Sequence, residues 1–148
     1  MTFQPITDYE LFHSLMTPYY REGENAHTPQ EQLDGFIGYL YDLLEKGIIS
    51  GAVAWDEKPV GFVLWALDSI DLPFSNKPGF GTILEIGVLA GFRGKGYGKE
   101  LSAFAESRMG NVAKYICAYG PAEVFWEKCG YRESGELAEN GLKIFVKG

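Results

Sequence analysis

Two spacings of hydrophobic residues divide the chain into helices and strands. In residues 9–16 and 33–44, apolar side chains recur every three or four positions, which is typical of one face of a helix. The second segment follows Thr28-Pro29-Gln30-Glu31, which predicts a capping box and a helix from about residue 29 to 46. Further helices are predicted where Tyr97, Leu101, Phe104 and Arg108 share one face, and in residues 121–130.

Short apolar runs between these segments predict β-strands. Turn-forming residues separate the runs, among them Asn140-Gly141, a typical hairpin turn. The runs are TFQPI, IISGAVAWD, VGFVLWAL, TILEIGV, AKYICAY, YRESG and LKIFVK. With the helices in between, their order predicts an α/β (α+β) fold, in which a sheet carries helices on its faces.

The composition predicts one globular domain over residues 1–148, with 46% hydrophobic residues and a net charge of −7. This charge argues against nucleic acid as a partner, because such binding depends on basic surface. The chain has neither an apolar run long enough for a membrane span nor an N-terminal signal pattern, so we expect a cytoplasmic protein without membrane contact. Cys117 and Cys129 have no metal-binding spacing, and no metal site is expected.

The segment Arg93-Gly94-Lys95-Gly96-Tyr97-Gly98-Lys99 joins a predicted strand to a predicted helix. Alternating glycines allow successive N–H groups to point into one turn, and the positive end of the following helix favours an anion such as a pyrophosphate. The plainer alternative is a solvated turn with basic surface residues. The spacing fits neither GxGxxG nor GxxxxGK[ST], so a phosphate site here would be of another kind.

Arg93-x-x-Gly96-x-Gly98, eight residues after Glu85, resembles the acetyl-CoA-binding motif of the GNAT N-acetyltransferase superfamily. A later segment, AYGPAEVFWEKCGY, is similar to a second family segment. The resemblance extends from about residue 47 to 147, whereas residues 1–46 match only in their predicted strand and two helices. It implies a single GNAT-like domain with a mixed, mostly antiparallel sheet of about six to seven strands and about four helices, and acetyl-CoA as co-substrate.

The resemblance also implies where the cofactor would bind. The pyrophosphate would lie on the glycine-rich loop, and the pantetheine arm would run beside the strand that contains Glu85. A bulge at Gly87 would then free a backbone N–H near Val88 for the thioester oxygen. The implied cofactor-binding residues are Ile86, Gly87, Val88, Arg93, Gly94, Lys95, Gly96, Tyr97, Gly98, Lys99, Phe125, Trp126 and Lys128.

Glu85 and Tyr119 are the predicted catalytic residues. Apolar flanks around Glu85 predict a raised pKa and a general base, although strand alternation could instead point its side chain at solvent. Trp126 stands where the family commonly has a tyrosine acid, and an indole N–H does not ionise in water. Tyr119, which stands where the family commonly has asparagine, is therefore the predicted acid, with water as the alternative.

The predicted reaction is direct transfer of an acetyl group to a primary amine in a ternary complex. The acidic composition favours a small, cationic amine, while a protein amine and a homodimer stay open. The rival function is a CoA-binding regulatory or scaffolding module with little turnover, and an unrelated nucleotide-binding domain is a third alternative. Cys117 as an acyl-carrying nucleophile is less favoured than a packing role.

Overall fold

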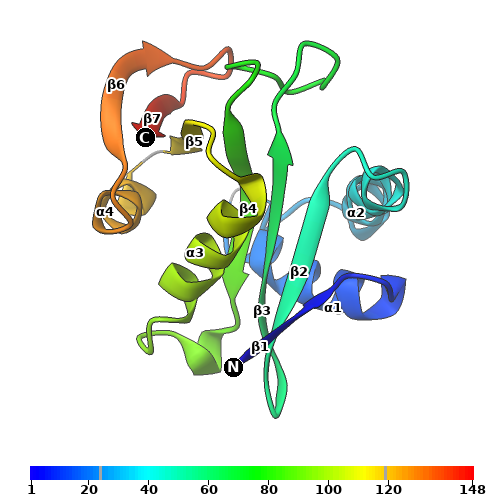
Figure 1. Cartoon of the computed structure of the whole chain (residues 1–148). Helices are drawn as coiled ribbons and strands as arrows, with labels where there is room; N and C mark the ends of the chain where they lie inside the picture. The colour runs from blue at the N-terminus through cyan, green and yellow to red at the C-terminus, as the bar shows by residue number, and fades with distance from the viewer. Residues whose placement is uncertain (24, 119) are drawn as a thin grey trace.

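Seven strands form one mixed sheet in this computed structural model, which describes residues 1–23, 25–118 and 120–148 (Figure 1). Their spatial order is β1-β2-β3-β4-β5-β7-β6. Neighbouring strands are antiparallel except β4 and β5, which are parallel, so the predicted mixed, mostly antiparallel sheet is confirmed. The strands are β1 (Thr2–Pro5), β2 (Ser50–Asp56), β3 (Lys58–Leu67), β4 (Gly81–Val88), β5 (Lys114–Ala118), β6 (Arg132–Leu137) and β7 (Lys143–Lys147).

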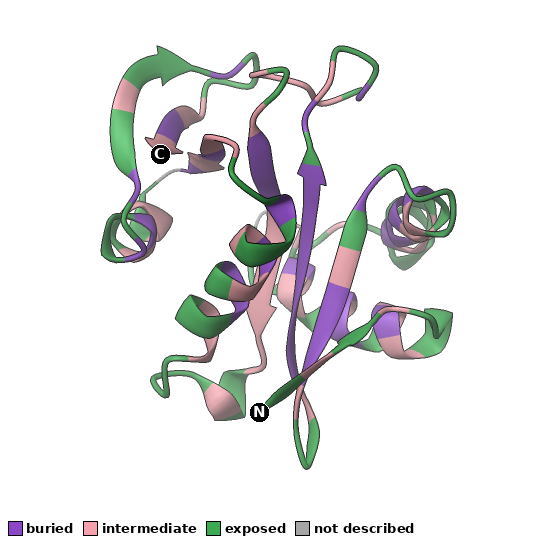
Figure 2. Ribbon diagram, in the orientation of Figure 1, coloured by how far each residue is buried: buried purple, intermediate pink, exposed green. Residues whose placement is uncertain are grey.

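Helices cover both faces of this sheet, and the strands between them carry most of its buried residues (Figure 2). On one face, α1 (Tyr9–Arg21) and α2 (Gln30–Glu45) pack against β2, β3 and β4. On the other face, α3 (Tyr97–Met109) and α4 (Pro121–Lys128) close a second core, and the 3-10 turn η1 (Ala90–Phe92) precedes α3. Across the described ranges, no helix is long and apolar enough to cross a membrane.

The capping box predicted at the start of α2 does not form. The helix begins at Gln30, and Pro29 takes the N-cap position without a side-chain cap. Thr28 therefore stands one residue too early for its hydroxyl to reach the free N–H groups of the first turn. Its Oγ1 donates a hydrogen bond to Asn25 Oδ1 instead, at 3.0 Å.

A β-bulge in β4 decides which way Glu85 points. Trp65 of β3 lies opposite Ile83, but Leu64 lies opposite Glu85, which leaves Leu84 as an extra residue on β4. The extra residue reverses the alternation, so Ile83 faces the α3 core while Glu85 faces α1. The bulge predicted at Gly87 is thus wrong in position, since Gly87 stays in register with Phe62.

Candidate active site

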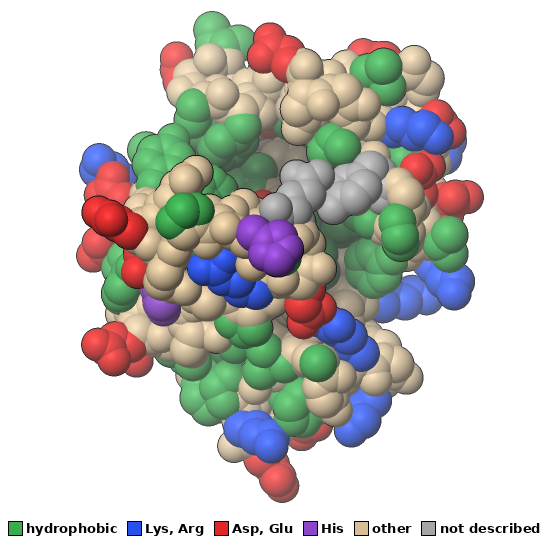
Figure 3. Space-filling view, turned by 180° about the vertical axis from the view of Figure 1, so that it is seen from behind, with side chains coloured by type: hydrophobic (Ala, Val, Ile, Leu, Met, Phe, Trp, Pro, Cys, Tyr) green, Lys and Arg blue, Asp and Glu red, His purple; other side chains and the backbone are tan. Residues whose placement is uncertain are grey.

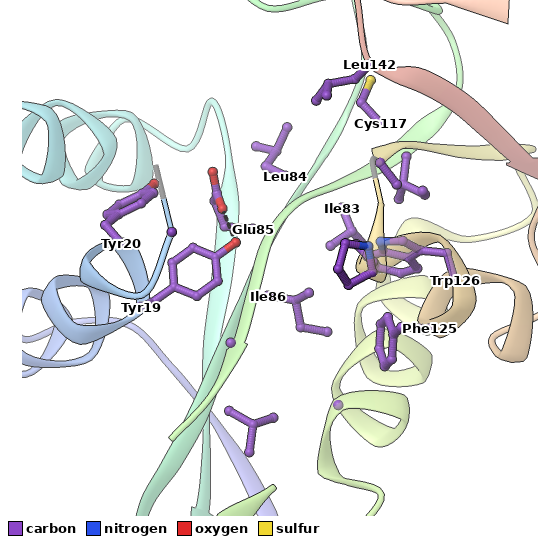
Figure 4. Close-up of a pocket in the computed structure, with 18 of the residues that line it drawn as sticks. Tyr19, Tyr20, Ile83, Leu84, Glu85, Ile86, Cys117, Phe125, Trp126 and Leu142 are labelled. Atoms are coloured by element: carbon purple, nitrogen blue, oxygen red, sulfur yellow. Dashed lines mark hydrogen bonds between the residues drawn. The ribbon is translucent and has the colours of Figure 1, made fainter. Parts of the chain in front are cut away.

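A cleft of about 730 Å³ opens where β4 and β5 part. The two strands pair at Gly81 with Lys114 and at Thr82 with Tyr115. Beyond these pairs, residues 83–88 line one wall of the cleft, and residues 116–118 with α4 line the other. Figure 3 shows hydrophobic side chains gathered around a hollow in the surface, and Figure 4 shows side chains that line the cleft. Its volume is in the usual range for small-molecule sites.

The glycine-rich loop lies at one end of this cleft. Gly94 and Gly96 have φ angles of +81° and +83°, a conformation that side chains with a Cβ rarely adopt, and Gly96 is the N-cap of α3. A Cβ built at either glycine would meet open space, so the backbone can be approached closely from outside. Together with the positive end of α3, this geometry fits the pyrophosphate of CoA.

Gly98, in the first turn of α3, is glycine for a different reason. A Cβ there would lie 3.1 Å from Cε1 of Phe125 on α4. The missing side chain therefore lets the Phe125 ring pack against the start of α3, and both residues line the cleft. The loop and the apolar wall of the cleft are joined at this contact.

Glu85 lies in the middle of the cleft, half-buried against the end of α1 (Figure 4). The Tyr19 hydroxyl donates a hydrogen bond of 2.5 Å to its Oε2. Burial raises the pKa of Glu85 from its ordinary value of 4.5 to about 7, and the hydrogen bond from Tyr19 opposes part of that rise. The carboxylate is therefore a group that can accept and release a proton near neutral pH.

Gly87 makes the contact between α1 and β4 possible. A Cβ at this position would lie 2.6 Å from Cε1 of Phe62 and 2.9 Å from Cδ1 of Tyr19. The rings of Tyr19 and Phe62 meet edge to face over it, with centroids 5.2 Å apart. Any larger residue would push Tyr19 away from Glu85, so the glycine two positions along the strand helps to hold Tyr19 against the Glu85 carboxylate.

Comparison with known proteins decides the family. A family model described as the acetyltransferase (GNAT) family matches residues 9–131. The chain belongs to this family. Acetylation that depends on acetyl-CoA is the activity of the family, and the protein is an acyltransferase. No curated protein matches the sequence at a significant level.

Solved structures of other acetyltransferases share the fold. A GCN5-related N-acetyltransferase from Ralstonia eutropha has a TM-score of 0.74 and 22% identity, over 93% of this chain and 96% of that one. PaiA N-acetyltransferase from Thermoplasma acidophilum, solved in complex with coenzyme A, has a TM-score of 0.69 and 15% identity over 99% of both chains. An aminoglycoside 6′-N-acetyltransferase from Acinetobacter haemolyticus has a TM-score of 0.69 and 14% identity, over 93% and 95%.

Some of the predicted cofactor residues of this acetyltransferase line the cleft, and others lie outside its lining. Along the cleft wall lie Ile86, Gly87, Val88, Gly98, Phe125 and Trp126. The basic side chains lie outside that lining: Lys95 and Lys99 are exposed on the loop and the first turn of α3, and Lys128 is exposed on α4. The apolar predicted residues thus lie along the cleft, and the basic ones lie outside its lining.

Arg93 and Tyr97 contact the protein itself. Arg93 Nε donates to the Val88 carbonyl at 3.0 Å, and its Nη2 forms an ion pair of 2.6 Å with Glu22 at the end of α1. The Tyr97 hydroxyl donates to Asp56 at the end of β2, outside the cleft lining. Both side chains therefore brace the loop against neighbouring elements.

Trp126 and Cys117 line the cleft and bear on two chemical roles weighed from the sequence, the acid and a nucleophile. Trp126 is buried, and its ring meets those of Phe125 and Tyr131 edge to face. Tyr119, the predicted acid, lies outside the described residues. Cys117 lines the cleft, and burial together with the nearby Asp68 raises the pKa of its thiol. A thiol held in its neutral form is a poor nucleophile.

Sequence reasoning did not single out several residues that line the cleft, among them Tyr19, Tyr20, Phe36 and Leu142. The first two come from α1, Phe36 comes from α2, and Leu142 comes from the turn before β7. Helical spacing places Tyr20 on the buried face with Phe12 and Met16, which was a usable signal. The contact of Tyr19 with Glu85, 66 positions away, carries no such signal.

Proposed function

We propose that this acetyltransferase moves the acetyl group of acetyl-CoA directly to a primary amine bound in the same cleft. The observation that carries the proposal is that Glu85 lines the same cleft as Val88 and Gly98, the residues on either side of the glycine-rich loop. Its pKa of about 7 suits a base that must work at neutral pH. The bound co-substrate supplies the acetyl group as a thioester, and every other requirement falls to side chains and backbone of this chain.

The residues that would hold the co-substrate follow the cleft. The loop N–H groups around Gly94 and Gly96 would bind the pyrophosphate, with Lys95 and Lys99 offsetting its charge. The arm would lie between Ile86 and Val88 of β4 and Phe125 of α4, where the unpaired edge of β4 can donate and accept backbone hydrogen bonds.

Glu85 would remove the proton that makes the acceptor amine unreactive. A primary ammonium beside the carboxylate gives up one proton to Glu85, directly or through a water, and the freed lone pair attacks the thioester carbonyl. The bond between the carbonyl carbon and sulfur then breaks, the nitrogen loses its second proton, and the leaving thiolate takes a proton from the predicted acid Tyr119 or from water. Tyr19 holds the carboxylate in place through its hydrogen bond. Transfer in one ternary complex agrees with the neutral state of Cys117, because a covalent acyl-enzyme would need its thiolate.

Thiol release on adding acetyl-CoA and a panel of amines tests this function. We expect acetyl-CoA, but not ATP or NAD, to raise the melting temperature, and we expect free CoA to appear only when an amine is present. Stabilisation by acetyl-CoA without any amine-dependent thiol release would contradict the enzymatic proposal and favour the CoA-binding regulatory module.

A further inference from the structure

Beyond Glu85, apolar side chains from four parts of the chain wall one part of the cleft, which we call the acceptor arm. They are Tyr20 at the end of α1, Phe36 on α2, Leu84 at the bulge of β4, and Leu142 before β7. The rings of Tyr20 and Phe36 meet edge to face with centroids 5.3 Å apart. Phe36 is 43% exposed, so the cleft offers apolar surface that a bound molecule can cover.

Negative charge is scarce among the described residues of the same walls. Among the described residues that line the cleft, Glu85 is the one carboxylate. Among the described carboxylates next to lining residues in the chain, Glu22 and Glu123 form ion pairs with Arg93 and Lys143, and Glu127 is exposed on α4. A ligand with one ammonium group finds one acidic partner here. A second ammonium deeper in the acceptor arm would lose its hydration among apolar side chains without gaining a carboxylate partner.

The Tyr20 hydroxyl gives a second indication of an amine. It is buried and has no partner of good hydrogen-bond geometry within the part of the chain that the structure describes, but it points toward Glu85 and its nearness lowers the pKa of that carboxyl (Figure 4). Buried polar groups in proteins are nearly always paired. An ammonium placed beside Glu85 would also donate a hydrogen bond of good geometry to the Tyr20 oxygen.

We infer that the acceptor is a monoamine with an apolar aromatic or aliphatic body, rather than a polyamine or another polycation. This inference rests on the proposed acetyl transfer and names the substrate class of the same site. The ammonium lies between Glu85 and Tyr20, and its body covers Phe36, Leu84 and Leu142. The acidic composition of the whole chain, which favours cations, does not extend to these walls.

Pentylamine and 1,5-diaminopentane test the inference, because they differ only in a second ammonium at the far end of the same carbon chain. With acetyl-CoA and thiol release as the readout, we expect kcat/KM for pentylamine to exceed that for the diamine by at least about 10-fold. A lysine-containing peptide is tested as a third acceptor. Equal or better turnover of the diamine, or turnover of the peptide and of neither small amine, would overturn the inference and leave acetyl transfer standing. No thiol release with pentylamine, the diamine or the peptide would contradict acetyl transfer itself.

Adding a carboxylate to the acceptor arm tests whether the amine's carbon chain lies there, because a new negative charge should shift the substrate preference toward the diamine. Leu142 lines the acceptor arm and is partly exposed, so Leu142→Glu places a carboxylate there. We expect the ratio of kcat/KM for the diamine to kcat/KM for pentylamine to rise by about 10-fold. Leu137→Glu is the matched control, because Leu137 is 65% exposed on the same hairpin and lies outside the lining. An equal ratio in wild type and Leu142→Glu would overturn the assignment of this arm to the acceptor.

A second pair of variants does not depend on a new charge. Phe36→Ala should raise KM for pentylamine several-fold and leave KM for acetyl-CoA unchanged. Tyr39→Ala, also an exposed aromatic of α2 but outside the cleft lining, should change neither. An unaltered KM for pentylamine in Phe36→Ala would show that the amine body does not contact α2 and would count against the inference.

Discussion

The Glu85 carboxylate is subject to two opposing effects in the cleft. Burial disfavours its charged form, and the Tyr19 hydroxyl stabilises that form through a hydrogen bond of 2.5 Å. Burial is the larger effect, so the pKa rises to about 7. The residue is thus tuned by its neighbours on α1 as much as by the strand that carries it.

Removing the Tyr19 hydroxyl should shift the pH dependence of the enzyme. Tyr19→Phe keeps the ring over Gly87 but loses the hydrogen bond that lowers the pKa of Glu85. The pKa then rises, and we expect the acidic limb of kcat/KM to move upward by roughly one pH unit. The exposed Tyr39→Phe should leave the profile in place, and a downward move of the limb in Tyr19→Phe would contradict the proposed contact.

The acid that protonates the departing thiolate is a separate prediction. Tyr119→Phe deletes the hydroxyl and keeps the ring, so we expect kcat to fall by at least about 10-fold while acetyl-CoA affinity stays nearly unchanged. Unchanged turnover would eliminate Tyr119 as the acid. If Trp126→Tyr then raised turnover, the wild-type site would lack an efficient acid.

At the scale of elements, the loop before α3 should bind its anion through the backbone. Gly96→Val forces a β-branched residue into the left-handed conformation at the helix N-cap, with φ of +83°. We expect acetyl-CoA binding to be lost in calorimetry while the circular dichroism spectrum stays native. Gly91→Val is the control, because Gly91 has no positive φ and a Cβ there meets open space. Normal binding by Gly96→Val would place the anion site elsewhere.

The elements themselves were largely readable from the sequence, since helical and strand periods are local properties. The order of helices and strands and the glycine-rich turn between β4 and α3 are confirmed. Local reasoning failed where one residue shifts the phase. Pro29 displaces Thr28 from the cap of α2, and the extra residue Leu84 turns Glu85 toward α1. Neither shift can be seen in hydrophobic spacing, because each depends on which neighbour the backbone meets.

The contacts of the site depend on the whole molecule, which brings α1 against β4. Tyr19 reaches Glu85 across 66 positions of sequence, and the acceptor arm combines residues from α1, α2, β4 and the β6–β7 turn. Such assemblies arise only when both faces of the sheet are packed. The glycine-rich motif could therefore indicate the co-substrate from sequence, while the walls proposed for the acceptor come from segments that only the fold brings together.

Burial of Glu85 should make the folded protein less stable above neutral pH. Because its folded pKa of about 7 lies above its ordinary 4.5, the folded state holds the proton more tightly, and stability falls as pH rises from 4.5 to 7. Glu85→Gln removes this loss. In urea unfolding, we expect the variant to gain about 1–3 kcal/mol over wild type between acidic and mildly alkaline pH. The exposed Glu139→Gln should show no such pH-dependent gain, and a gain confined to acidic pH would contradict the sign.

The pH dependence of kcat/KM in wild type and Glu85→Gln, measured by thiol release with a high-pKa amine, tests the assignment of the base most directly. We predict that wild-type kcat/KM rises with pH and levels off above about 7, where Glu85 is ionised. For Glu85→Gln we predict a loss of at least about 100-fold near neutrality that shrinks as pH approaches the pKa of the amine. Parallel profiles, or no loss at neutral pH, would contradict the assignment of Glu85 as the general base.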